Sequence, residues 1–321
     1  MLRVLGVEFF DSSTPYTLPP TPWPHFGKAN QGITGPVMFT LVSDPSLTSF
    51  VKRHTPLILK GRLRAFRARL QKISGRHYCP VCRSRVRAFQ PLPEYYRDNL
   101  TKHGWPFADD EAETCNQLSY SCPRCQASDR DRLCALYLRD YLRSIQRNSA
   151  IRMVDFAPSA PLSDFIRREI ARCGQNISYR TADAFAEGVD DKVDVTDLRL
   201  YQDCEFDFFI CSHVLEHVSD DRKAISELHR ILRPGGQGIL MVPIVLCVSE
   251  IDEDPTVVDE GERWRRFGQF DHVRLYSKQG FIERVKAAGF LVHQHGREFF
   301  GAKEFTRTGI SAQSILYVVE K

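Results

Sequence analysis

Four cysteines form two pairs with the same internal spacing, which is typical of a zinc site. The pairs are Cys79-Pro80-Val81-Cys82 and Cys122-Pro123-Arg124-Cys125, with 39 residues between them. Each C-P-x-C segment turns so that both thiolates face one point, and four thiolates satisfy a tetrahedral Zn²⁺ ion. We expect a structural site, because four thiolates leave no open position for chemistry. The plainer alternative is four thiols that bind no metal.

A second group of chemically capable side chains lies in Cys211–His217. His213, Glu216 and His217 follow i, i+3 and i+4 spacing, so in a helical turn all three point the same way. Such a cluster is able to hold a divalent metal. The sequence favours the plainer interpretation, in which Glu216 and His217 cap the turn and pack near a cofactor.

Candidates for a general base are His213, His272 and Asp271, because histidine titrates nearest neutral pH. Asp271 and His272 follow an acidic run, residues 250–262, in a loop whose length predicts a lid or substrate element. The alternatives are a solvated acidic run and a pair that only fixes the loop.

The segment from Phe206 to Pro243 reads as strand, helix and strand. Phe206–Cys211 is an apolar run fit for a strand buried on both faces. Asp220 and Asp221 open an amphipathic helix, which Pro234-Gly235-Gly236 is predicted to end before a strand at Ile239–Val242. A β-α-β unit of this length predicts a parallel or mostly parallel sheet.

Further elements are expected on both sides of this unit. The predicted strands are Ile151–Phe156, Ile177–Thr181, Lys192–Thr196, Phe290–His293 and Ile315–Val319, and the predicted helices are Ser128–Asn148, Leu162–Arg172 and Ser277–Ala288. Asp183 follows the second of these strands. An acidic side chain there is able to accept both ribose hydroxyls of a nucleoside, as in Rossmann-like folds, although it is also able to cap the loop.

The runs FDFFICSHVLEHVSD, ELHRILRPGG and LMVP together resemble class I S-adenosylmethionine-dependent methyltransferases of the type-11 group. The runs CPRCQASDRDR and GQFDHVRLY resemble a bacterial subset that carries a Cys₄ zinc module in front. The resemblance implies an α/β fold: a Rossmann-like seven-stranded sheet whose last two strands form an antiparallel hairpin.

The same resemblance implies S-adenosylmethionine as cofactor. The implied cofactor residues are Asp155, Ala157, Asp183, Asp194, Ser212 and His213. This chain departs from the family after Asp155, where Ala157, Pro158 and Ser159 stand in place of a Gly-rich loop. HVLEH also resembles the metal-binding ExxEH of small-RNA 2′-O-methyltransferases and ubiquinone-pathway O-methyltransferases, with His213 in place of the first Glu.

We expect the 321 residues to divide into an irregular Pro-rich segment (1–48), a basic helix with the zinc module and a bridging helix (49–148), and, as the resemblance implies, a methyltransferase domain (149–321). Between Pro45 and Pro93 there are 12 basic residues and no acidic one. Leu59–Ile73 reads as a basic amphipathic helix, which either contacts an anionic partner or docks on its own domain. Met38 is an alternative start.

Ten cysteines, most outside the two pairs, indicate a reducing cytoplasm rather than a disulfide scaffold. The chain has no apolar run of about 18 residues and no secretory pattern at its N-terminus, so we expect a cytoplasmic protein without a membrane span.

The expected activity is methyl transfer to a hydroxyl of a sugar, a polysaccharide or another small molecule. One alternative is an RNA methyltransferase, suggested by the zinc module and the basic helix. Another is a binding protein without activity, suggested by the loop without glycine at residues 157–159.

Overall fold

The computed structural model describes residues 76–321, apart from residues 147, 148 and 175. The Pro-rich segment 1–48, the basic helix at 59–73 and the expected end of the bridging helix at 147–148 lie outside these residues. Within the described part of the chain, no helix is long and apolar enough to cross a membrane.

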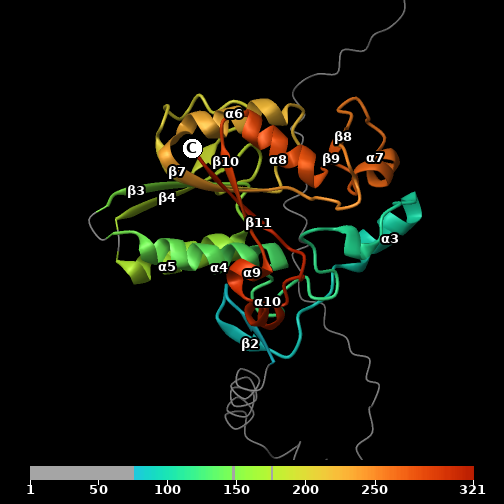
Figure 1. Ribbon diagram of the computed structural model, residues 1–321, viewed down its shortest axis with the longest axis horizontal. Helices are drawn as coiled ribbons and strands as arrows, with labels where there is room; N and C mark the ends of the chain where they lie inside the picture. Colours follow the sequence, from blue (N-terminus) through green and yellow to red (C-terminus); the bar gives the residue numbers. More distant parts are fainter. Residues whose placement is uncertain (1–75, 147–148, 175) are drawn as a thin grey trace, which may run out of the picture.

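Seven strands form one mostly parallel sheet (Figure 1). They are β3 (Ile151–Phe156), β4 (Ile177–Asp183), β5 (Asp191–Lys192), β6 (Phe206–Ser212), β7 (Leu232–Met241), β10 (Leu291–His295) and β11 (Leu316–Glu320). The order across the sheet is β10-β11-β7-β6-β3-β4-β5, and β11 is antiparallel to both neighbours. This order is the Rossmann-like methyltransferase fold, so the predicted fold class is confirmed.

Helices cover both faces of the sheet, with α4 (Asp129–Ser144) and α5 (Ala160–Cys173) on one face and α6 (Asp221–Ile231) and α8 (Lys278–Ala287) on the other (Figure 1). Side chains of β6 alternate between the two cores. Phe208 and Ile210 pack in the α4–α5 core, and Phe209 and Cys211 pack in the other. Because both faces are covered, the apolar run of β6 is buried, as predicted.

The predicted helix starts are confirmed by their N-caps. Ser128 Oγ accepts a hydrogen bond from Asp131 N at the start of α4, and Asp220 accepts one from Lys223 N at the start of α6. Ser277 caps α8 in the same way. Residues with free hydroxyl or carboxylate oxygens thus mark these boundaries as the sequence indicates.

Three predicted boundaries are wrong. Helix α4 ends at Ser144 rather than at Asn148, because Ile145 already has an extended backbone. The third strand, expected at Lys192–Thr196, is only β5, because Asp194 Oδ1 accepts hydrogen bonds from the amide and hydroxyl of Thr196 and turns the chain. Helix α6 ends at Ile231 rather than at Pro234-Gly235-Gly236, which lie within β7. The β6–β7 register shifts here, and this irregularity accommodates Gly235 at φ 74°.

Several short elements were not predicted. They are α3 (Glu94–His103), the 3₁₀ turn η1 (Asp109–Glu111), β8 (Asp252–Glu253), α7 (Glu260–Phe267), β9 (Arg274–Leu275), α9 (Arg297–Phe300) and α10 (Ala302–Thr308). None of the residues of α3 is buried, and α7 buries only Trp264 and Phe267. Elements this short lack the repeated apolar stripe that periodicity detects.

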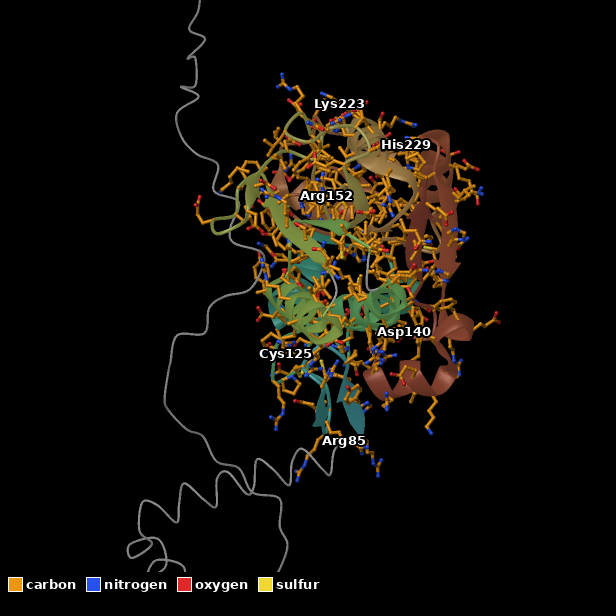
Figure 2. The ribbon with its side chains drawn as sticks, turned by 90° about the vertical axis from the view of Figure 1, so that its left-hand side faces the viewer. Arg85, Cys125, Asp140, Arg152, Lys223 and His229 are labelled. Carbon is orange, nitrogen blue, oxygen red and sulfur yellow. The ribbon has the colours of Figure 1, made fainter. Side chains whose placement is uncertain are left out.

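The cysteine-bearing segment begins with a hairpin, β1 (His77–Cys79) and β2 (Ser84–Val86), on the outer side of the α4–α5 layer (Figure 2). Arg83 Nη2 lies 2.6 Å from both carboxylate oxygens of Glu169 in α5. One core continues from this hairpin through α4 and α5 to the sheet. The predicted domain boundary between residues 148 and 149 therefore separates a helix and a strand that share a core.

The fully buried guanidinium of Arg132 connects distant segments of the chain. It donates to five carbonyl oxygens and lies 3.8 Å from the centre of the Phe89 ring. The acceptors belong to Ser119, Tyr120, Ala127, Thr308 and Gly309. Arg132 therefore joins the cysteine-bearing segment to the chain that leads into β11.

We expect Arg132→Met to reduce the free energy of unfolding by more than about 3 kcal/mol, because several buried carbonyls would lose their donor. Arg143→Met, the same change at an exposed position of α4, is the control and should have little effect. Urea unfolding in zinc-containing buffer measures both, and equal stability of the two variants would contradict the role of Arg132.

Candidate functional site

The six residues predicted to bind the cofactor lie along one edge of the sheet. Asp155 and Ala157 lie at the end of β3, Asp183 at the end of β4, Asp194 just after β5, and Ser212 and His213 at the end of β6. Because these strands are parallel, their carboxyl ends meet at this edge, where Rossmann-like folds bind ligands.

The loop after β3 keeps a left-handed residue although it has no glycine. Ala157 has φ 50°, a conformation that glycine adopts more readily, and its amide donates to Ala182 O at 2.9 Å. Ser159 caps α5 by accepting from Leu162 N at 3.3 Å, and its hydroxyl donates to Asp131 at 2.7 Å. The loop therefore has a left-handed residue and a capped helix start without any glycine.

Asp155 is buried and directed into the domain. Tyr179 donates to its Oδ2 at 2.6 Å, and Ser163 lies 3.5 Å away. Burial raises the pKa of Asp155 to about 7. These contacts are internal, so a cofactor contact of Asp155 stays a prediction.

Asp183 caps its own loop with one oxygen. Oδ1 accepts from the amides of Phe185 and Ala186 at 2.6 and 2.7 Å, whereas no described residue donates to Oδ2. Loop capping and ribose binding are therefore compatible in this residue. Phe185, which the sequence analysis did not single out, is 52% exposed beside it and offers an apolar surface.

The turn after β6 differs from the predicted helical turn. It is a short turn closed by His217 N donating to Val214 O at 3.0 Å, and His213 has φ 59°. The side chains still converge, because Glu216 Oε1 lies 3.1 Å from His213 Nδ1 and 3.9 Å from His217 Nε2. Glu216 is fully buried.

A second segment, after α7, supplies Asp271 and His272 to the same place. His217 Nδ1 lies 3.2 Å from Asp271 Oδ2, and His272 Nε2 lies 4.0 Å from Glu216 Oε1. The backbone amide of Val273 donates to Glu216 O at 2.9 Å and holds the two segments together. The structure thus brings together all the residues predicted as catalytic and those of the HxxEH cluster.

Arg274, in β9, holds this turn in place. Its buried guanidinium donates to the carbonyls of Leu215, Val218 and Ser219. These carbonyls lie in a turn without regular backbone pairing, so a buried donor is needed to satisfy them. Sequence reasoning missed this role, although Arg274 lies in the GQFDHVRLY run.

The charges in this cluster are set by burial and by neighbours. Burial lowers the pKa of His213 and that of His272 to about 4, so both rings are neutral at pH 7. Burial alone would raise the pKa of Glu216, but His213, His217 and His272 together outweigh it and the pKa falls to about 2. In the same way, burial acts to raise the pKa of Asp271, but His217, His272 and Gln269 together outweigh it and the pKa falls to about 2.

The N-terminal part of the described chain also contributes to this region. Arg130, at the start of α4, lies near enough to His213 to lower the pKa of that histidine, and its guanidinium is 3.4 Å from the Tyr120 hydroxyl. Helix α3 packs on α7, where Trp264 contacts Tyr95 and Tyr96. The available sequence signal was the CPxCxxxxRxR run, which contains Arg130.

The four paired cysteines meet at one point. Cys79 and Cys125 Sγ are 3.8 Å apart, as are Cys82 and Cys122 Sγ, and all four sulfurs lie within 4.8 Å of one another. A tetrahedron with Zn–S bonds of about 2.3 Å has sulfur–sulfur edges of about 3.8 Å. The geometry fits the predicted zinc ion.

Both cysteine pairs are followed by a residue in the left-handed conformation, Arg83 (φ 56°) and Gln126 (φ 62°). In the second pair, Gln126 N donates to Cys122 O at 2.8 Å and Cys122 N donates to Ala127 O at 2.9 Å. The two turns are thus alike in backbone as well as in sequence, as expected for two halves of one metal site.

Comparison with known proteins gives one family match and several fold matches. Residues 164–240 match a family described as a methyltransferase domain. No curated protein matches the chain.

Three solved structures illustrate the fold matches. A SAM-dependent methyltransferase from Archaeoglobus fulgidus is 15% identical (60% of this chain, 94% of that chain, TM-score 0.36). The CMeT domain of the citrinin polyketide synthase is 13% identical (63% and 54%, TM-score 0.42). The [4+2]-cyclase SpnF is 17% identical (73% and 97%, TM-score 0.35).

We expect purified protein to contain about one equivalent of zinc held by the four cysteines. Cys122→Ser should lose the zinc and melt at a lower temperature, because metal binding is coupled to folding of the module. Cys247→Ser, at an exposed cysteine outside the cluster, is the control. Elemental analysis showing no zinc in fully reduced wild-type protein would reject the site.

The buried Asp155 predicts a pH dependence of stability. Its folded pKa of about 7 lies above the unfolded value near 3.9, so the folded state keeps the proton longer. The free energy of unfolding should therefore fall between about pH 4 and 7, by at most about 4 kcal/mol. Asp155→Asn should remove this fall, and Asp164→Asn, at an exposed position of α5, should not. Parallel pH profiles for wild type and Asp155→Asn would contradict the assignment.

Proposed function

We propose that this protein is an S-adenosylmethionine-dependent methyltransferase that acts on a hydroxyl of a sugar, a polysaccharide or another small molecule. The observation that carries the proposal is the sheet order with antiparallel β11, with a carboxylate at the end of β4. A carboxylate at that strand end is the position from which Rossmann-like folds hold a ribose. The family match at 164–240 spans most of α5 through most of β7.

The residues at the sheet edge fit this cofactor. Asp183 Oδ2 has no donor among the described residues and is free for the ribose hydroxyls. Ala157 and Ser159 present a turn with small side chains, to which the methionine part of the cofactor can approach closely. The cofactor supplies a methyl group that its sulfonium already activates, so the protein has mainly to position the acceptor oxygen in line with it.

The histidine–carboxylate cluster lies beside this edge and fits the acceptor half of the reaction. The acceptor oxygen forms a bond to the methyl carbon while the carbon–sulfur bond breaks, and the hydroxyl proton passes to a base. His213 Nε2 is buried and has no hydrogen-bond partner among the described residues, so we assign it as that base. In this proposal the zinc module stabilises the fold and takes no part in the reaction.

RNA is the alternative acceptor, and one observation favours it. A cavity of about 340 Å³ beside the β1–β2 hairpin is lined by Arg76, Arg85, Arg139 and Arg307. Figure 2 places Arg85 at the end of the molecule opposite Lys223 of α6. Arginine clusters of this kind suit phosphate groups.

The experiment that decides the acceptor uses the full chain and isotopically labelled cofactor. Cell extract is divided into RNA, glycan and metabolite pools, and methylated products are identified by mass spectrometry. Label in the glycan or metabolite pool supports the proposal, and label in RNA supports the alternative. If calorimetry detects no binding of S-adenosylmethionine, the chain is a binding protein of another kind.

Asp183 gives a sharper test of cofactor binding. Asp183→Asn keeps an oxygen that can cap the loop but loses the charge, so we expect a stable protein that binds S-adenosylmethionine more weakly by about 2 kcal/mol. Asp183→Ala should lose loop cap and affinity together. Asp140→Ala, an exposed position of α4, is the control. An unchanged dissociation constant for Asp183→Asn would overturn the ribose assignment.

A further inference from the structure

We propose that Glu216, His217 and His272 bind a divalent first-row transition-metal ion beside the methyl-transfer site. One ligand atom from each residue lies within 4.8 Å of the others. The two histidines come from separate segments, the turn after β6 and the segment between α7 and β9. A second part of the proposal is that the hydroxyl of the acceptor would occupy an open coordination position of the ion. This second part rests on the proposed function.

The first observation is the state of Glu216. Its side chain is 0% exposed, and neither carboxylate oxygen accepts a hydrogen bond from the part of the chain that the structure describes. His213 Nδ1 is near, at 3.1 Å from Oε1, but the contact lacks hydrogen-bond geometry. A buried carboxylate is normally hydrogen-bonded, paired or bound to a metal.

The second observation is the direction of the two imidazole lone pairs. His272 Nδ1 lies 3.1 Å from the carbonyl oxygen of Phe267, which can only accept, so Nδ1 carries the hydrogen. His217 Nδ1 lies 3.2 Å from the carboxylate of Asp271, whose negative charge favours a hydrogen on that nitrogen. When neutral, both rings therefore turn an unprotonated Nε2 toward Glu216, at 4.0 and 3.9 Å.

Two nitrogen lone pairs and a carboxylate that face one another repel, and either a proton on one ring or a cation between them relieves the repulsion. The partners behind the rings are those that metal-binding histidines usually have, since a carboxylate or a backbone carbonyl fixes the tautomer from the far side. Asp271, His217 and the ion would form such a triad. Asp271 is therefore a positioning residue in this proposal.

The donor set indicates which ions fit. Two imidazoles and one carboxylate suit Zn²⁺, Fe²⁺, Co²⁺ or Mn²⁺, whereas Mg²⁺ and Ca²⁺ prefer oxygen ligands throughout. Three protein ligands leave coordination positions open, as in catalytic rather than structural sites. The ligand set differs from the one that the HVLEH spacing indicates, because His272 takes the place of His213.

In the test, the full chain with zinc bound to its four cysteines is titrated with Mn²⁺ alone. Bound Mn²⁺ is followed by electron paramagnetic resonance. Mn²⁺ is the probe because thiolates select softer ions, so the cysteine site should not take it up. We expect one saturable site in the wild type and at least tenfold weaker binding in Glu216→Gln and His272→Gln. His293→Gln, at an exposed histidine of β10, should bind as the wild type does. Zn²⁺ should displace the bound Mn²⁺.

Thermal unfolding separates metal binding from a structural role. The melting temperature of Glu216→Gln without added metal measures what the carboxylate contributes to folding by itself. Added Mn²⁺ should raise the melting temperature of the wild type and not that of Glu216→Gln. No saturable Mn²⁺ binding by the wild type, or equal binding by Glu216→Gln, would overturn the proposal.

Calorimetry with S-adenosylmethionine on the same samples distinguishes this proposal from the proposed function. Cofactor binding in a protein that binds no Mn²⁺ rejects the metal site and leaves the methyltransferase assignment standing. Mn²⁺ binding in a protein that binds no cofactor supports the metal site and rejects the methyltransferase assignment.

Discussion

Buried backbone carbonyls in irregular segments need donors, and two buried arginines supply them in this protein. Arg132 gathers carbonyls of the cysteine-bearing segment and of the chain before β11, and Arg274 gathers those of the turn after β6. A guanidinium suits this task because it has five donors in a fixed plane and is always charged. The sheet alone would place the strand ends, but the positions of the turns around the site depend on these two side chains.

This arrangement makes the site composite. The edge of the sheet supplies Asp183 and His213, the segment after α7 supplies Asp271 and His272, and the start of α4 supplies Arg130. Helix α4 begins four residues after Cys125, the last of the four clustered cysteines, and it also packs under the sheet. The four-cysteine segment and the sheet are therefore parts of one packed body, and the geometry of one depends on the folding of the other.

The regular part of the fold was predictable from sequence because its signals are local. Apolar runs, N-caps and amphipathic spacing place β3, β6, α4, α6 and α8 within a few residues. For the site, the sequence predicted which residues take part but not how they are arranged. Asp271 and His272 are more than fifty residues from Glu216, and their segment is joined to the turn by the Val273 amide and by Arg274 of β9, which pairs with β8 through only two residues. The role of Arg274 depends on which carbonyls the fold leaves unpaired, and no local pattern records that.

The left-handed alanine in the loop after β3 has a consequence for the timing of ligand capture. A glycine there would be free to sample many backbone states in the open loop, and binding would have to remove that freedom. Ala157 instead has a strained backbone conformation in the folded chain, and it samples far fewer backbone states than a glycine would. Under the proposed function, such a loop would be ordered before the cofactor arrives, so association would be limited by diffusion to a preformed surface rather than by a search among loop conformers.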